Sequence, residues 1–203
     1  MLFRSVERST GIWTSANIVT CARVALVPAW LLCAELMGSG DGTALHLPSL
    51  AVALLFMALS LTDKLDGYLA RSRGEVTTFG KFLDPIADKL VVVVSLCFLL
   101  EVGDVSAWVL LVIVAREFLV SGLRMVVASR GTVVAASSLG KWKTATTMVS
   151  ISGLLLCRAL PVGGPCLALS TLSRLLLLVA VVLTAWSGAD YFAKSWGVIS
   201  DET

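Results

Sequence analysis

The sequence predicts an all-helical, polytopic membrane protein with six transmembrane helices in a single domain of 203 residues. Apolar residues make up 57% of the chain and charged residues only 15%, whereas soluble globular proteins contain about 45–50% and about 25%. Six stretches are also mostly apolar over about the 20 residues that a helix needs to cross a bilayer. This composition excludes a soluble enzyme, a disordered chain and a fibrous protein. A net charge of +2 is too small to indicate a nucleic-acid partner.

The six predicted spans follow one another with short connections. They cover residues 18–37, 47–70, 82–100, 107–128, 141–160 and 167–192. Residues 1–14 alternate apolar side chains with Arg4 and Arg8, a pattern compatible with a short interfacial helix or with an extended basic tail. Residues 193–203 are expected to form a cytoplasmic tail.

Basic residues set the predicted orientation of these spans, because cytoplasmic loops of membrane proteins are enriched in Lys and Arg. Basic side chains precede the first span, follow the sixth, and occupy the second and fourth connections. The alternate connections carry mainly acidic side chains, with Arg158 the only basic residue. We therefore expect both termini to face the cytoplasm and loops 38–45 and 102–106 to face outward.

The cysteines are odd in number, scattered, and without a spacing typical of metal sites. We expect them to act as small apolar residues rather than in disulfides or metal sites; they are Cys21, Cys33, Cys97, Cys157 and Cys166. Arg174 is expected to reach the outer membrane surface, and the sequence assigns no role to Asp190.

Four aspartates lie at the adjoining ends of the second and third spans, where charge in a membrane helix is costly. Asp63 and Asp66 are three residues apart, and Asp84 and Asp88 are four apart, so each pair shares one face of its helix. If the two helices pack antiparallel, the four carboxylates converge on one cavity. Oxygen ligands without His or Cys favour hard divalent cations such as Mg²⁺, Mn²⁺ or Ca²⁺, and two-metal sites are suited to phosphoryl transfer.

Small and basic residues accompany these aspartates. Gly67, Ala70 and Gly80 would let a neighbouring helix or a flat ligand approach the backbone closely. Arg71 would bind a phosphate through its planar guanidinium. The alternative interpretation is that nearby basic side chains only neutralise the aspartates; these are Lys64, Arg71, Lys81 and Lys89. The number and spacing of the carboxylates favour a functional site.

A second group of charges lies in the fourth and fifth spans. Arg116 and Glu117 fall in the middle of an apolar stretch, where a charge needs a cavity or a partner. We expect a basic cluster to hold an acceptor that bears a phosphate; its members are Arg116, Arg124, Lys141 and Lys143. The alternative is that Arg116 pairs with a carboxylate and the lysines extend to the membrane surface.

Residues 63–88 also carry a recognisable signature. Asp63-x-x-Asp66-Gly67-x-x-Ala70-Arg71, eight residues, and Gly80-x-x-x-Asp84-x-x-x-Asp88 resemble the signature of the CDP-alcohol phosphotransferases at every fixed position. The resemblance implies six transmembrane helices around a polar cavity that faces the cytoplasm. It implies that two divalent cations bind to Asp63, Asp66, Asp84 and Asp88, and that Asp88 is also the general base. It further implies that CDP contacts Asp63, Gly67, Ala70, Arg71 and Gly80.

Stretches outside the signature resemble one group within that family, the bacterial phosphatidylglycerophosphate synthases. They are Asn17-Ile18-Val19-Thr20 with Arg23 and Pro28, and residues 115–124 and 139–144. Met125 departs from the acidic residue that members often carry there. The resemblance implies transfer of a phosphatidyl group from CDP-diacylglycerol to glycerol 3-phosphate with release of CMP. It also implies a homodimer in the bacterial cytoplasmic membrane, with Mg²⁺ or Mn²⁺ as cofactor and membrane lipids as neighbours.

Other functions stay open at this point. A CDP-diacylglycerol-dependent cardiolipin synthase or a phosphatidylinositol-phosphate synthase would use the same motif, and the basic cluster fits any phosphorylated acceptor. A cation-coupled carrier would also keep aspartates inside a membrane, but near the midplane and in broken helices. Metal-dependent release of CMP separates the carrier from the enzymes. The sequence does not choose between Mg²⁺ and Mn²⁺ or predict the preferred acyl chains.

Overall fold

The computed structural model describes residues 14–37, 40, 42–73, 78–129 and 138–200. These residues form the helices α1 (Ser15–Met37), α2 (Leu47–Arg73), α3 (Thr78–Glu101), α4 (Ala107–Ser129), α5 (Ser138–Cys157) and α6 (Gly164–Ser200). They contain no strand, so the prediction of an all-helical fold with six helices is confirmed. Residues 1–13, which hold most of the predicted interfacial segment, lie outside the described residues.

Helix α6 is longer than the hydropathy pattern predicts. It continues to Ser200, so most of the predicted cytoplasmic tail is helical instead. Lys194 donates to Asp190 at 2.7 Å, one helical turn earlier, and such a pair stabilises a helix. A search for apolar stretches stops where charged side chains begin, although the helix itself continues, which explains the difference.

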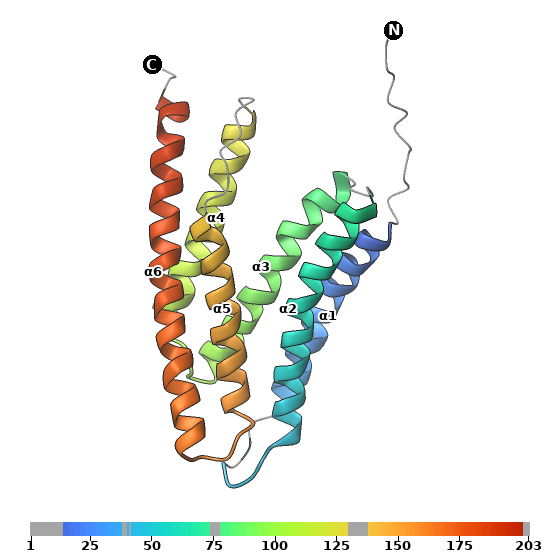
Figure 1. The fold of residues 1–203 in the computed structure, drawn as a ribbon, viewed down its shortest axis with the longest axis vertical. Helices are drawn as coiled ribbons and strands as arrows, with labels where there is room; N and C mark the ends of the chain where they lie inside the picture. The colour runs from blue at the N-terminus through green and yellow to red at the C-terminus, as the bar shows by residue number, and fades with distance from the viewer. Residues whose placement is uncertain (1–13, 38–39, 41, 74–77, 130–137, 201–203) are drawn as a thin grey trace.

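The helices run up and down, and the connections that the structure describes lie toward one end of the bundle. Figure 1 shows loops 42–46, 102–106 and 158–163 toward the end opposite both termini. Helix α1 packs against α2 and α3, while α6 packs against α4 and most extensively against α5. Contacts of α2 with α5 and of α3 with α4 join these two groups. The groups diverge toward the end that carries the termini (Figure 1).

An aromatic cluster fixes α1 against α2 and α3. The ring of Trp30 lies 6.0 Å from the ring of Phe56 and 5.9 Å from that of Phe98, centre to centre. Its indole nitrogen donates to the carbonyl of Val52 at 3.0 Å, so the only polar atom of this buried side chain is satisfied. These contacts set the position of α1, which carries the polar residues described below.

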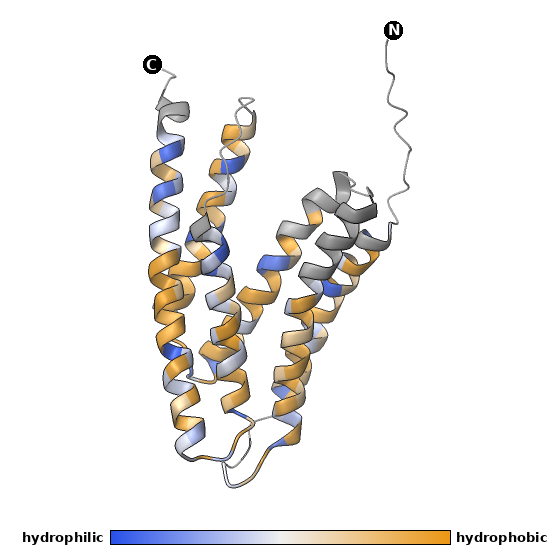
Figure 2. Cartoon of the chain, viewed as in Figure 1, coloured by the Kyte–Doolittle hydropathy of each residue, from blue (hydrophilic) through white to orange (hydrophobic). Residues whose placement is uncertain are grey.

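Apolar side chains also cover much of the outer surface. Phe118, Leu119 and Met125 on α4 are each at least 66% exposed, and apolar residues line the length of the helices (Figure 2). Within the described residues, 17–37 and 164–196 form helices long and apolar enough to cross a membrane, and 47–62 form a shorter apolar helix. Large exposed apolar surfaces are typical of membrane or interaction surfaces, so the structure indicates a membrane protein.

Candidate functional site

The acidic motif lies where α2 ends and α3 begins. Asp63 and Asp66 belong to α2, and Asp84 and Asp88 belong to α3. The two helices run in opposite directions, and α2 ends and α3 begins at the end of the bundle where α1 starts and α6 stops (Figure 1). The backbone therefore brings both halves of the motif to the same end. Except for Asp88, the side chains of the motif lie outside the described part of the chain, so the roles of Asp63, Asp66, Gly67, Ala70, Arg71, Gly80 and Asp84 stay predictions.

Asp88 is held by a cation from the first helix. The Nη1 atom of Arg23 donates to Oδ1 of Asp88 at 2.8 Å. The side chain of Arg23 is 2% exposed, whereas that of Asp88 is 42% exposed. The carboxylate is therefore held by a buried guanidinium while part of the Asp88 side chain remains accessible to solvent.

Arg23 belongs to a polar face on an otherwise apolar helix. Asn17, Thr20 and Arg23 follow at three-residue intervals and are all buried. Residues three apart lie on one side of a helix, and α1 packs against α3. The sequence analysis names these residues in a family resemblance but assigns them no role. A guanidinium is costly in an apolar span, and that cost is the signal that could have predicted a carboxylate partner for Arg23.

Glu117 organises the basic residues between α3, α4 and α5. It accepts a hydrogen bond from Lys143 of α5 and another from Nη1 of Arg116 at 3.3 Å. Lys89 of α3 donates to the hydroxyl of Ser121 on α4. We call this group the basic junction; its described members are Lys89, Arg116, Lys143 and Glu117. Its cations outnumber its carboxylate, so the junction can attract an anion.

The structure brings together only part of the predicted acceptor cluster. Arg116 and Lys143 share Glu117, and Lys143 is buried, which does not fit the alternative in which the lysines extend to the membrane surface. Arg116 pairs with the adjacent Glu117, and binding of a phosphorylated acceptor by this cluster stays a prediction. Lys141 is exposed, and the guanidinium of Arg124 lies 6.0 Å from the ring centre of Tyr191 on α6.

Helix α6 leaves room for Arg116. A Cβ at Gly188 would lie 3.0 Å from Cγ of Arg116, which is tighter than ordinary van der Waals contact. The Nε atom of Arg116 and the hydroxyl of Tyr191 are buried, and neither has a hydrogen-bond partner among the described residues. Gly188 therefore borders the basic junction at Arg116, whereas Tyr191 lies beside Arg124, and no sequence pattern marked either residue.

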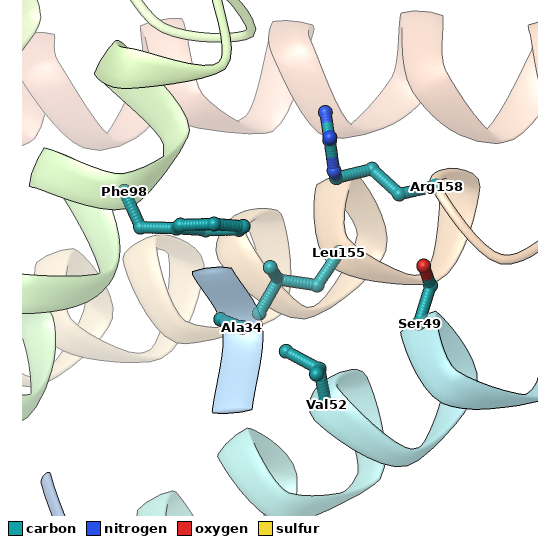
Figure 3. Close-up of a pocket in the computed structure, with 6 residues that line it drawn as sticks. All are labelled: Ala34, Ser49, Val52, Phe98, Leu155 and Arg158. Carbon is teal, nitrogen blue, oxygen red and sulfur yellow. The ribbon is translucent and has the colours of Figure 1, made fainter. Parts of the chain in front are cut away.

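One small cavity among the described residues is lined by residues of neither polar group. This cavity of about 10 Å³, enough for about one water molecule, is shown in Figure 3; its lining residues are Ala34, Ser49, Val52, Phe98, Leu155 and Arg158. The described residues contain no cluster of three or more His, Cys, Asp or Glu side chains that would hold a metal ion. Three of the four predicted metal ligands lie outside this search.

Comparison with known proteins identifies relatives over nearly the whole chain. The sequence profile of the CDP-alcohol phosphatidyltransferases matches residues 13–186. A CDP-diacylglycerol–glycerol-3-phosphate 3-phosphatidyltransferase of Bacillus subtilis is 43% identical, covering 89% of this chain and 94% of its own. A protein of that name from Rickettsia bellii is 40% identical, covering 87% and 92%. A CMP-forming cardiolipin synthase of Oryza sativa is 37% identical, covering 92% of this chain and 58% of its own.

Proposed function

The chain belongs to the CDP-alcohol phosphatidyltransferase family, and on this basis we propose that it makes phosphatidylglycerophosphate. It would transfer the phosphatidyl group of CDP-diacylglycerol to glycerol 3-phosphate and release CMP. The observation that carries this proposal is the similarity, over 89% of the chain, to a protein named CDP-diacylglycerol–glycerol-3-phosphate 3-phosphatidyltransferase. The chain retains the complete acidic motif within the matched region.

The donor set of the motif fits a pair of hard divalent cations. Its two halves lie on adjoining ends of α2 and α3, and carboxylate oxygens suit Mg²⁺ or Mn²⁺. The proposed ligands are Asp63, Asp66, Asp84 and Asp88. When bound, two such ions would neutralise negative charge on the pyrophosphate of the substrate. The CDP group would contact Asp63, Gly67, Ala70, Arg71 and Gly80.

Asp88 would act as the general base. It takes the proton from the primary hydroxyl of glycerol 3-phosphate, and the hydroxyl oxygen then attacks the phosphorus on the lipid side. The bond from that phosphorus to the oxygen shared with CMP breaks. The Arg23 pair supports this role, because it fixes one carboxylate oxygen while the side chain remains partly open. A correctly placed base contributes about 10²–10⁴-fold to a rate.

The basic junction would hold the phosphate of the acceptor. Arg116 and Lys143 share a single carboxylate, Glu117, so a phosphate entering beside them would gain charge-assisted hydrogen bonds. Lys141 and Arg124 are more exposed and would guide the acceptor toward the junction. Arg116 fits a phosphate best, because its planar guanidinium offers several donors in a fixed arrangement.

The proposed setting is a bacterial cytoplasmic membrane crossed by all six helices. The excess of Lys and Arg near the termini and the α2–α3 connection supports an active site that faces the cytoplasm. Both soluble products, CMP and protons, would then leave on that side. A homodimer is a further expectation from the family.

A direct assay tests which acceptor receives the phosphatidyl group. Purified protein is incubated with CDP-diacylglycerol, Mg²⁺ or Mn²⁺, and one acceptor at a time, and CMP is measured. We expect CMP with glycerol 3-phosphate, and none when the metal is chelated. CMP with phosphatidylglycerol alone would favour cardiolipin synthesis, which the Oryza sativa relative keeps as the second candidate. CMP with inositol phosphate alone would indicate a phosphatidylinositol-phosphate synthase, and metal-independent behaviour without CMP would favour a carrier.

A further inference from the structure

Two cysteines meet where α5 ends and α6 begins. Cys157 is the last residue of α5, and Cys166 lies in the first turn of α6. The thiol of Cys157 lies 3.7 Å from the carbonyl oxygen of Cys166, and the thiol of Cys166 lies 3.6 Å from the carbonyl oxygen of Cys157. Such reciprocal contacts place both side chains between two closely spaced backbones, as a disulfide requires.

The segment between the two cysteines is held from several sides. The backbone nitrogen of Val162 donates to the carbonyl of Gly42 at 2.7 Å, and that of His46 donates to the carbonyl of Ala159 at 2.8 Å. These hydrogen bonds tie loop 158–163 to the segment that follows α1. Because these hydrogen bonds hold the loop between α5 and α6, the two cysteines keep the close placement that their thiol contacts show.

Ion pairs brace the helices on either side of the loop. Arg158 donates to Oδ2 of Asp104 at 3.0 Å, and Nη2 of Arg174 lies 3.7 Å from Oδ1 of the same residue. Asp104 follows α3, Arg158 follows α5, and Arg174 belongs to α6. The expectation that Arg174 only reaches the membrane surface therefore omits its position beside Asp104. Together these pairs keep the start of α6 next to the end of α5.

This loop lies at the end of the bundle opposite both termini (Figure 1). The distribution of Lys and Arg predicts that this end faces outward, into the compartment where disulfides persist. Cys21 and Cys33 lie on α1 and Cys97 on α3, so they serve as internal controls.

We propose that Cys157 and Cys166 are a dithiol site that forms a disulfide by exchange with an external disulfide compound. The thiolate of one cysteine attacks a sulfur of the donor and expels one donor thiolate. The other cysteine then attacks the mixed disulfide and expels the second donor thiolate. The two cysteine thiols are oxidised, the donor disulfide is reduced to two thiols, and the ten residues 157–166 form a closed loop.

The expected consequence is a more stable pairing of α5 with α6. Closing a short loop restricts the unfolded chain, so the midpoint of thermal unfolding should rise by about 5 °C. Since the disulfide lies at the opposite end of the bundle from Asp88, turnover should change little. This inference goes beyond the proposed reaction and does not depend on it.

The test uses cells that express the full chain and oxidised glutathione, which stays outside the membrane. After treatment at pH 8.5, free thiols are blocked with N-ethylmaleimide, and the purified protein is digested with trypsin without reduction. Trypsin cuts after Arg158, so the cysteines fall in two different peptides, 144–158 and 159–174. We expect these peptides to be recovered linked, and to separate on reduction.

Matched variants make the result decisive. Cys97→Ser should leave the linked peptides unchanged, while Cys157→Ser and Cys166→Ser should each abolish them. Recovery of both cysteines as N-ethylmaleimide adducts after glutathione treatment would overturn the proposal, as would glutathione on only one of them. Linked peptides formed only in inverted membrane vesicles would overturn the outward location.

Discussion

Arg23 of α1 and Asp88 of α3 form an ion pair of 2.8 Å in which the guanidinium is buried and the carboxylate is partly open. They are 65 residues apart in the chain. Helix α1 therefore does more than pack against α2 and α3, because it supplies the cation that orients the proposed base. The asymmetry of exposure matters, since the arginine cannot turn to solvent while the carboxylate can still meet a substrate.

Arg23→Gln should reduce turnover more than stability. The substitution removes the charge and the donor that fix Asp88, so we expect CMP release to fall about 10–100-fold, in line with a misplaced catalytic group. Asp88 remains partly solvated, so the stability loss should stay below the about 3–5 kcal/mol typical of a broken, fully buried pair. CMP assays and thermal unfolding of the purified variant measure both effects.

Arg23→Lys is the matched control for that prediction. It keeps the charge but loses the planar guanidinium, and the two cations are not equivalent in such pairs. Its activity should lie between those of the native chain and Arg23→Gln. Full activity in both variants would show that the pair does not position Asp88.

Asp88→Asn should retain nucleotide binding and lose turnover. Asparagine keeps the size of the side chain and an oxygen but cannot accept the proton of the acceptor, so a loss of about 10²–10⁴-fold is expected. CMP release gives the rate, and calorimetric titration with CDP in the presence of Mg²⁺ gives the binding. A near-normal rate would remove Asp88 from the role of base.

Lys143→Met should weaken binding of glycerol 3-phosphate. A charged hydrogen bond contributes about 1.5–3 kcal/mol, so the KM for this acceptor should rise about 10–100-fold. The KM for CDP-diacylglycerol should change little, because that substrate is assigned to α2 and α3. Lys194→Met, at an exposed position of α6, is the control and should leave both KM values unchanged. Equal effects on both substrates would point to a structural role for Lys143.

The sequence predicts the central part of every helix, because a run of about 20 mostly apolar residues is typical of a membrane-crossing helix. It does not predict which polar faces meet. Spacing shows that Arg116 and Glu117 lie inside one helix, but only packing shows that Lys143 of α5 shares Glu117. The Arg23–Asp88 pair escaped prediction for the same reason.

The sequence does not predict the contact between the two cysteines, because a turn separates them. Cys157 and Cys166 are nine residues apart, a spacing with no helical or metal-site meaning, and they come together only because α5 and α6 pack as neighbours around loop 158–163. Patterns within one helix are readable in a single sequence, whereas contacts between helices depend on rotation and register that the sequence does not display.

Gly153→Ala should destabilise the α5–α6 pair, because a Cβ at this position would overlap the hydroxyl of Ser173 on α6. Ser150 also donates to the carbonyl of Ser173 at 2.8 Å, so the two helices cannot separate without losing that hydrogen bond. Overpacking of this kind costs about 1–3 kcal/mol, and thermal unfolding in detergent should show a lower midpoint. Gly140→Ala, on the same helix with nothing near the added carbon, is the control and should be neutral or slightly stabilising. Adding Ser173→Ala to Gly153→Ala removes the overlapping oxygen, so part of the lost stability should return; a purely additive loss would show that the clash is not its cause.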